Sequence, residues 1–467
     1  MKKEAKLEKE IDLHKPYIDR VELECACGGK MKRVEEVLDV WFDSGVSSWA
    51  ALRYPQKKEL FEKFWPADLN LEGTDQFRGW WNSQIITSVI CFDRAPFKSI
   101  LTHGIVLDVK KGKMSKSKGN AITPEEVIQK FNRDFMRHYL VKTSRGEDFA
   151  FDYEAFRDVK RFYDILWNSL NYGAMYLDLE LGKEVEWKGL KAEDKWILSR
   201  LASCGKAMKA GYENYLFHEP VESAEKFIME DFSRTYIKLI RDRTGAEKEL
   251  LGKIFSKIMF DFLRLFAPIA PHFSEFAFQG MKGKNAKESI HLYELPEVEE
   301  KAIDAALEKE MDFCRDAAQN VLSLREEKSL RLRWPLRKLV VVTESGKEFG
   351  ELKEVLAGMC NVLAVEESKE KPKGEFAEKA MEKYRLFLDI SADAALKEEW
   401  EFRELVRRVQ DLRKQKKMRP EDRATLSISC SDAGFLKKFS KKLEEETNSK
   451  ISEKQGKMEK ILEREFY

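Results

Sequence analysis

Residues 68–107 read DLNLEGTDQFRGWWNSQIITSVICFDRAPFKSILTHGIVL, and this stretch decides the fold. A β-like run at 68–71 is followed by an amphipathic stretch at 74–92 and a second apolar run at 100–107. The order predicts a strand, a helix and a second strand. Because a β-α-β unit favours a parallel sheet, we predict an α/β domain in this part of the chain.

Polar groups follow both predicted strands. Ligands of parallel sheets bind beyond the carboxyl ends of the strands, which is where Glu72 and His103 would lie. Further along, Thr123 is predicted to cap a helix that has Pro124 in its first turn, followed by two glutamates that complement the helix dipole.

The loop after the second strand contains Lys113-Met114-Ser115-Lys116-Ser117, between Gly112 and Gly119. Two ammonium groups on a glycine-flanked loop can fold over a polyphosphate, and the hydroxyls and backbone amides add donors. A solvated surface loop is the alternative, since Lys and Ser are common in this chain. We expect this pentapeptide by chance in roughly one of a few thousand chains, which favours the nucleotide-binding interpretation.

The composition bounds the class of protein. The chain has 467 residues, 43% of them hydrophobic, which predicts two to four domains with cores of their own. No apolar run approaches the roughly 20 residues that span a bilayer, and the first ten residues lack a secretory signal, so we expect a cytoplasmic protein. Seven scattered cysteines predict free or metal-bound thiols. Because Lys and Arg number 84 against 83 Asp and Glu, a polyanion partner would have to meet local basic patches.

Two further regions follow the α/β region. Helical periodicity runs from about 152 to 328 and predicts a helical bundle, whereas alternating apolar residues after Trp334 predict a small α/β domain. We therefore expect three domains, at 1–152, 153–330 and 331–467. No internal repeat is evident.

Four motifs, in order and approximate spacing, resemble those of class I aminoacyl-tRNA synthetases of the isoleucyl type. They are Asp39-Val40-Trp41-Phe42-Asp43-Ser44-Gly45, Glu72-Gly73-Thr74-Asp75-Gln76-Phe77-Arg78-Gly79-Trp80, Thr102-His103-Gly104 and the Lys113 loop. The resemblance implies an α/β plus all-α chain. It would hold the second half of a Rossmann-type catalytic domain, a helical-bundle anticodon-binding domain and a small C-terminal α/β tRNA-binding domain.

The resemblance also implies roles for single residues. Lys113 and Lys116 would stabilise charge on the phosphates, while Trp41 and Trp80 would form walls of the isoleucine pocket. The remaining ATP or adenylate contacts would be Glu72, Gly73, Asp75, Gln76, His103, Gly104, Met114, Ser115 and Ser117. Without the family, either Trp is more often a core residue, and the polar groups near Thr74 can equally be helix caps.

The implied reaction is the activation of isoleucine by ATP with Mg²⁺, followed by transfer to tRNA(Ile). The family's other signature, His-x-Gly-His, is absent, as are the first half of the nucleotide fold and the editing domain. We therefore expect the chain to need a separate N-terminal half. Two alternatives are a non-catalytic tRNA-binding or assembly protein and a synthetase for valine or leucine.

Metal and RNA contacts complete the expectations. Cys25 and Cys27 supply two of the four ligands of a structural Zn²⁺ site, or are two ordinary thiols on a turn. The late basic helix is predicted to bind tRNA, with a solvated helix face as the alternative. Its candidate residues are Arg407, Arg408, Arg413, Lys414 and Lys417. Bundle aromatics such as Trp196 and Tyr236 suit stacking on RNA, although aromatics at helical spacing are more often core.

Overall fold

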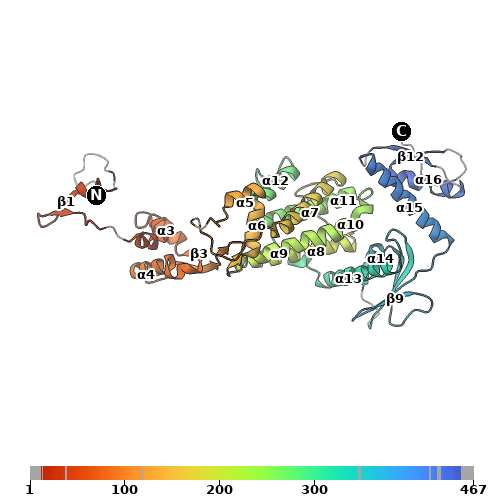
Figure 1. Ribbon diagram of the computed structural model, residues 1–467, viewed down its shortest axis with the longest axis horizontal. Coiled ribbons are helices and arrows are strands. Elements are labelled where there is room, and N and C mark those ends of the chain that lie inside the picture. Colours follow the sequence, from red (N-terminus) through yellow and green to blue (C-terminus); the bar gives the residue numbers. More distant parts are fainter. Residues whose placement is uncertain are drawn as a thin grey trace. The chain divides into compact units, whose positions relative to one another are not determined.

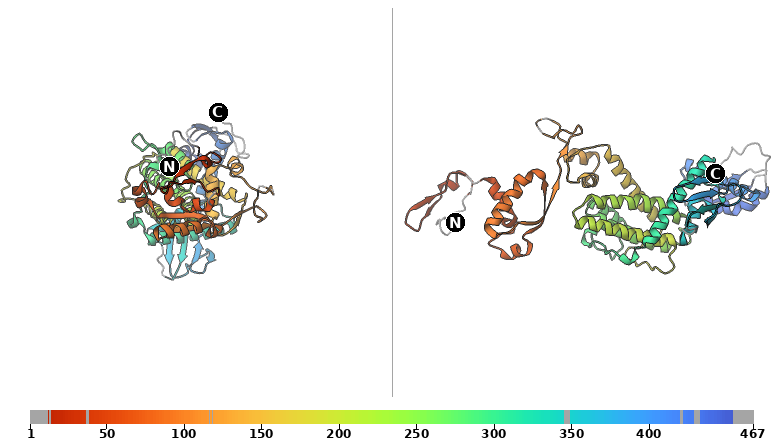
Figure 2. Two further views of the ribbon diagram at one scale, coloured as in Figure 1. Left: turned by 90° about the vertical axis from the view of Figure 1, so that its left-hand side faces the viewer. Right: turned by 90° about the horizontal axis from the view of Figure 1, so that it is seen from below.

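The computed structural model describes residues 12, 14–36, 39–115, 117, 119–344, 349–419, 422–428 and 433–453 (Figures 1 and 2). Lys116 lies outside the described residues. The chain divides into two compact units, Met1–Lys130 with Leu140–Tyr153, and Phe131–Tyr139 with Glu154–Tyr467. In the part of the chain that is described, no helix combines the length and the apolar character needed to cross a bilayer.

The first unit contains the predicted parallel β-α-β unit. Strand β3 (Ala67–Gly73) leads through the 3-10 turn η2 (Thr74–Arg78) into helix α4 (Trp80–Phe92), and strand β4 (Phe97–His103) returns beside β3. The two strands are parallel, and Gly73 lies opposite His103 in the register. Helix α1 (Val40–Gly45) packs against α4. The sequence prediction of strand, helix and strand is confirmed.

Short elements surround this unit. They are the antiparallel hairpin β1 (Glu22–Glu24) and β2 (Lys30–Lys32), helices α2 (Ser47–Ala50), α3 (Lys58–Phe64) and α5 (Pro124–Lys130), and the parallel pair β5 (Val106–Leu107) and β6 (Phe149–Ala150). Thr123 caps α5 as predicted, because its hydroxyl oxygen accepts a hydrogen bond from the Glu126 backbone N–H at 3.3 Å.

The second unit begins as a helical bundle, which confirms the periodicity prediction. Its helices are α6 (Arg133–Thr143), shared between the two units, α7 (Ala155–Tyr176), α8 (Ala192–Glu213), α9 (His218–Lys226), the π-helical η4 (Phe227–Tyr236), α10 (Ile237–Ile240), α11 (Lys248–Phe266), α12 (Pro271–Met281) and α13 (Ala305–Glu327). Trp196 and Tyr236 are fully buried and belong to the core. The Tyr236 hydroxyl donates to Asp194, which also accepts from Arg243, so these three buried side chains satisfy one another.

The chain ends in α/β structure, as predicted. A four-stranded sheet has the order β8-β7-β10-β9 and is followed by helix α15 (Ala394–Gln415). The remaining elements are β7 (Leu336–Val342), α14 (Lys353–Cys360), β8 (Val362–Ser368), β9 (Ala377–Ala380), β10 (Arg385–Leu388), β11 (Ala424–Ile428), α16 (Ala433–Thr447) and β12 (Ser449–Glu453). Strands β7 and β8 are parallel, as are β11 and β12. A small core of its own forms around Phe402, Val409 and Leu443.

Candidate active site

The carboxyl edge of the β3–β4 sheet brings several predicted residues together. A Cβ atom at Gly73 would lie 2.7 Å from Asp75 Oδ1 and 3.6 Å from His103 Cε1, so a side chain at this position would require the exposed Asp75 carboxylate to move. The exposed His103 ring has its Nδ1 2.9 Å from the Gly104 carbonyl oxygen. This hydrogen bond requires the proton on Nδ1 and leaves Nε2 as an acceptor.

Gly104 has a structural requirement that the sequence did not indicate. A Cβ atom at this position would lie 1.9 Å from the carbonyl oxygen of Glu147. The neighbouring Ile105 N–H donates to Asp148 Oδ1 at 2.7 Å, which fixes the approach of the two segments. The missing side chain at Gly104 therefore serves backbone packing, whatever ligand it meets.

Gln76 caps helix α4. Its Oε1 accepts from the Trp80 backbone N–H at 2.9 Å, and its Nε2 donates to Asp75 Oδ2 at 2.9 Å. Sequence reasoning considered Thr74 or Asp75 for the cap, but the amide of Gln76 makes this contact. Asp75 is exposed and Glu72 is half-buried, so both carboxylates remain accessible at the sheet edge.

The two tryptophans expected at the amino-acid pocket lie on adjacent helices. Trp80 Nε1 donates to the Ser44 carbonyl oxygen at 2.9 Å, which fixes the indole of α4 against α1. Trp41 follows the cap of α1, where Asp39 Oδ1 accepts its backbone N–H at 2.7 Å, and the residue is 46% exposed. The next residue along α4, Trp81, is the core tryptophan at 2% exposed.

The Lys113 loop is held by two side chains that sequence reasoning missed. Asp108 Oδ1 accepts the backbone N–H of Gly112 at 2.7 Å and that of Lys110 at 2.9 Å. Asn120 Nδ2 donates to Asp108 Oδ2 at 2.7 Å, and its Oδ1 accepts the Ser115 backbone N–H at 3.0 Å. Asp108 and Asn120 thus join the two ends of the loop.

The same contacts lower the pKa of the Asp108 carboxyl group. The hydrogen bond from the Gly112 backbone contributes most, followed by that from Asn120. Within the loop, the Ser115 and Ser117 hydroxyls lie 2.7 Å apart, and Met114 Sδ accepts the Ile122 N–H at 3.3 Å. Lys113 is exposed. Among the described residues, no hydrogen bond or ion pair joins the loop to the sheet-edge group.

Helix α4 is apolar on its exposed side. Ile86, Val89 and Ile90 are 50%, 47% and 77% exposed, whereas Gln84 and Ser88 are fully buried. Gln84 Oε1 accepts from Asn70 Nδ2 at 3.1 Å on β3, so the polar residues face the sheet. A contiguous group of exposed large apolar side chains is typical of an interaction surface. The exposed face of α4 therefore has the character of a protein-binding surface.

The cysteine turn brings two thiols close together, half the number of ligands that a structural zinc site takes. It is closed by the Cys25 N–H, which donates to the Gly29 carbonyl at 2.8 Å, and the Cys25 side chain lowers the pKa of the Cys27 thiol. Structural Zn²⁺ takes four ligands. In the described ranges no group of three or more His, Cys, Asp or Glu side chains is placed to bind a metal, so these two thiols alone do not fit a closed site.

The predicted tRNA-binding residues of the late basic helix include one buried residue and four exposed residues. Arg413 differs from the expectation for a phosphate contact, because it is 5% exposed and donates to the carbonyl oxygens of Arg419 and Asp422, each at 2.8 Å. These carbonyls belong to the loop that follows α15, and the Arg413 guanidinium supplies the donors that satisfy them. The other four candidates are exposed: Arg407, Arg408, Lys414 and Lys417. Arg407 also lies 3.5 Å from Asp411.

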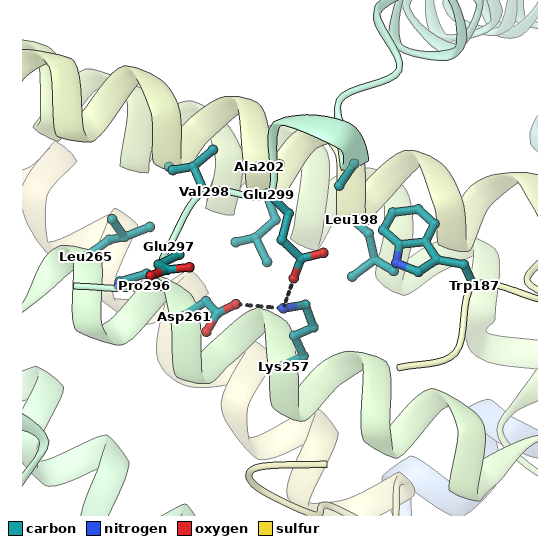
Figure 3. A pocket seen from close by; sticks show the side chains of 13 residues that line it. Trp187, Leu198, Ala202, Lys257, Asp261, Leu265, Pro296, Glu297, Val298 and Glu299 are labelled. Carbon is teal, nitrogen blue, oxygen red and sulfur yellow. Dashed lines mark hydrogen bonds and ion pairs between the residues drawn. The ribbon is translucent and has the colours of Figure 1, made fainter. Parts of the chain in front are cut away.

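A small cavity in the bundle is too small for a nucleotide. Lys257 points between Asp261 and Glu299, with 3.2 Å to an oxygen of each (Figure 3). The cavity drawn in Figure 3 has a volume of about 30 Å³, and a separate open depression of about 480 Å³ also reaches Lys257, Asp261 and Glu299. We assign the small cavity a structural role.

Sequence comparisons define the class of protein. Residues 1–152 match the family described as tRNA synthetases class I (I, L, M and V), and residues 194–340 match the anticodon-binding domain of tRNA ligases. With the β-α-β unit and the helical bundle, these matches define a class I aminoacyl-tRNA synthetase.

Individual relatives narrow the class. Isoleucine–tRNA ligase of Archaeoglobus fulgidus is 40% identical over 374 residues, covering 78% of this chain and 36% of that protein. The Methanopyrus kandleri ligase is 38% identical over 391 residues, with coverage of 78% and 36%. This chain belongs to the isoleucine–tRNA ligase family, and it spans about a third of the length of these relatives.

Among solved structures, a LeuRS–tRNA–LeuAMS complex of Agrobacterium radiobacter K84 has a TM-score of 0.48 and 21% identity. The match covers 61% of this chain and 36% of the LeuRS chain. This likeness is too weak to support an inference about function.

Proposed function

We propose that this chain supplies one half of the site in which isoleucine is activated by ATP to isoleucyl-adenylate and then transferred to tRNA(Ile). The observation that carries the proposal is the Lys113 loop, closed by Asp108 and Asn120. The loop begins a few residues after His103 ends β4, so in the sequence a pair of lysines follows the sheet edge where ligands of parallel sheets bind.

The chemistry needs positioning and charge neutralisation. The isoleucine carboxylate would attack the α-phosphate of ATP, and the bond to the pyrophosphate would break as the pyrophosphate leaves. Mg²⁺ bound to the ATP phosphates would supply charge neutralisation. Lys113 and Lys116 would stabilise the negative charge on the phosphates, with Met114, Ser115 and Ser117 shaping the loop. Neither lysine needs to transfer a proton.

The sheet edge would hold the other reactants. Glu72 and Asp75 are accessible carboxylates that suit the substrate amine and the ribose hydroxyls, while Gly73 ends β3 and Gln76 caps α4 beside them. His103 and Gly104 would lie against the nucleotide. The pocket for the isoleucine side chain would lie between Trp41 and Trp80, since flat indoles discriminate apolar side chains by shape.

The second half of the catalytic site would come from another polypeptide segment. The exposed apolar residues of α4 support this, because water-facing Ile86 and Ile90 are costly unless covered. The same segment would have to bring two further ligands if Cys25 and Cys27 hold Zn²⁺. The anticodon-binding domain and the exposed basic residues of α15 would bind tRNA(Ile). We place the protein in the cytoplasm, where tRNA is charged.

Amino-acid-dependent exchange of pyrophosphate into ATP tests the proposal. The chain would be combined with the part of the Archaeoglobus fulgidus ligase that it does not match, supplied as a separate polypeptide. We expect exchange with isoleucine, weaker exchange with valine or leucine, and none from either polypeptide alone. If valine supports faster pyrophosphate exchange than isoleucine does, the amino-acid substrate is valine. If binding of the two polypeptides is demonstrated but exchange is absent, the chain is a non-catalytic tRNA-binding protein.

A further inference from the structure

The end of helix α13 and the end of helix α15 have the same local structure. Arg325 Nη2 donates to the Arg331 carbonyl at 2.9 Å, and Arg413 Nη2 donates to the Arg419 carbonyl at 2.8 Å. Five residues recur at a spacing of 88 positions: Val321, Leu324, Arg325, Lys328 and Arg331 return as Val409, Leu412, Arg413, Lys416 and Arg419. The sequence alone did not show this repeat, because the positions between these residues differ.

The equivalence continues through the strands that follow each helix. In each case a strand, a helix and a parallel strand follow, β7-α14-β8 and then β11-α16-β12 (Figure 1). An asparagine with positive φ precedes the second strand, Asn361 at 51° and Asn448 at 44°. The carbonyl oxygens of these asparagines accept the N–H groups of Leu336 and Ala424, both at 3.1 Å. Strand β11 is therefore the counterpart of β7.

Residues 305–368 and 394–453 are thus two copies of one module, and the copies differ at one edge of the sheet. Strand β7 is paired on both sides, with β8 in parallel and with β10 antiparallel. The apolar residues of β10 are buried, namely Leu386, Phe387 and Leu388. Among the described residues, β11 pairs with β12 alone. The edge of β11 that corresponds to the β10 side of β7 has no strand beside it in that part of the chain.

The backbone of Thr425 faces this open edge. The Ala424 N–H donates to the Asn448 carbonyl, and alternate residues of a strand bond to the same neighbour. The backbone groups of Ala424, Leu426 and Ile428 therefore face β12, whereas the N–H and C=O of Thr425 point away from it. Thr425 is exposed. A row of such groups is a template for pairing with another strand.

Strand β11 also lacks the residues that protect the edges of sheets. Proteins prevent edge strands from pairing with other chains by placing charged side chains or proline on them. The edge strands β8, β9 and β12 follow this rule, since they carry Glu366 and Glu367, Glu378 and Lys379, and Lys450 and Glu453. In contrast, β11 reads ATLSI and contains neither a charged residue nor a proline. Its composition does not oppose pairing with a second strand.

We infer that the open edge of β11 pairs antiparallel with β11 of a second copy of the chain. A two-fold axis perpendicular to the sheet sets two identical strands antiparallel, which is the direction that β10 takes beside β7. The combined sheet has the order β12-β11-β11-β12, with four strands as in the first module copy. Because β11 is uncharged, the two copies meet without like-charge repulsion. The inference does not depend on the proposed function.

Sedimentation of the full chain over a range of concentrations tests the inference. The average mass should rise from that of one chain towards that of two chains. Thr425→Pro removes a backbone donor from the open edge in both copies and should weaken association at least about 10-fold. Its unfolding temperature should change little, because proline is tolerated where the N–H does not serve the neighbouring strand. Thr425→Val keeps the donor and a β-branched side chain, so it should retain association.

A charge placed on the edge gives a second measurement. Thr425→Lys puts like charges on both strands of the pair and should weaken association, more strongly at low salt than at high salt. The matched control is Leu363→Lys, which adds the same charge at an exposed position of β8 and should leave association unchanged.

Three results would overturn the inference. The first is a chain that stays monomeric at every concentration, in which case a lowered unfolding temperature of Thr425→Pro would show that the chain's own residues pair with this edge. The second is an equal effect of Thr425→Lys and Leu363→Lys, which would remove β11 from the contact. The third is association that is lost in Ile86→Lys with Ile90→Lys but retained in Thr425→Pro, which would place the contact on helix α4.

Discussion

Asn120 closes the Lys113 loop by donating to Asp108 Oδ2 at 2.7 Å while its own carbonyl oxygen accepts the Ser115 N–H. One side chain thereby ties the end of the loop to both its start and its middle. A loop that moves over a polyphosphate still needs a fixed anchor, and Asp108 and Asn120 form that anchor.

Loss of the Asp108–Asn120 anchor of the Lys113 loop should slow adenylate formation. Asp108→Ala removes the acceptor of two backbone amides and of Asn120, so we expect kcat for pyrophosphate exchange in the two-polypeptide enzyme to fall roughly 10- to 100-fold. tRNA affinity should not change. Asp68→Ala, an exposed aspartate at the start of β3, is the control and should retain full activity. Full activity of the Asp108→Ala enzyme would show that the anchor of the Lys113 loop is not needed for adenylate formation.

Substitution of Trp41 should affect substrate binding, whereas substitution of Trp81 should affect stability. Trp41→Ala should raise the KM for isoleucine by about 10- to 100-fold with little change in the KM for ATP, because it removes a pocket wall from an exposed position. Trp81→Ala should instead lower the free energy of unfolding by about 3 to 5 kcal/mol, since Trp81 is buried. Parallel rises in both KM values for Trp41→Ala would argue against a pocket role.

The ion pairs of Glu404 should make stability depend on pH. Burial raises the pKa of this carboxyl group, but hydrogen bonds from Arg333, Arg331 and Trp334 outweigh burial and hold the pKa at about 2. A depressed pKa stabilises the fold above the unfolded value of 4.5, and the contribution is lost as the pH falls from 4.5 towards 2.

Glu404→Gln should therefore lower the free energy of unfolding by about 1 to 3 kcal/mol at pH 7. The difference from the unaltered protein should shrink by about 1 kcal/mol at pH 3.5, as measured by urea unfolding. Glu398→Gln, which breaks an exposed pair with Lys438, should have little effect at either pH. A difference that is constant with pH would contradict the assignment.

The exposed face of α4 should bind the missing half of the catalytic domain. Ile86→Lys with Ile90→Lys should weaken association with the unmatched part of the Archaeoglobus fulgidus ligase by roughly 30-fold or more, measured by sedimentation. The chain itself should remain folded, because both side chains already face solvent. Asn82→Lys, at an exposed polar position of α4, is the matched control. Equal association of all three proteins would place the interface elsewhere.

Local patterns predicted the fold well. The β-α-β order and the Thr123 cap depend on residues that are close in the sequence, and both predictions are confirmed. Contacts between distant residues were not predictable. Asp108 meets Asn120 across 12 positions, and Arg413 is buried by carbonyl oxygens that only the folded loop brings to it.

The sequence did not predict the exposed apolar face of α4, because polar Gln84 and Ser88 lie on the buried side of the helix. The roles of the individual site residues stay predictions.

The central claim is that Lys113 and Lys116 act on the phosphates of ATP. The most direct test is isoleucine-dependent pyrophosphate exchange by the two-polypeptide enzyme with Lys113→Ala or Lys116→Ala, alongside tRNA affinity. We predict that each variant loses about 100- to 1,000-fold in kcat, as for removal of one charge-stabilising donor, with tRNA affinity unchanged. Full exchange activity in both variants, or equal losses in exchange and tRNA binding, would contradict the account.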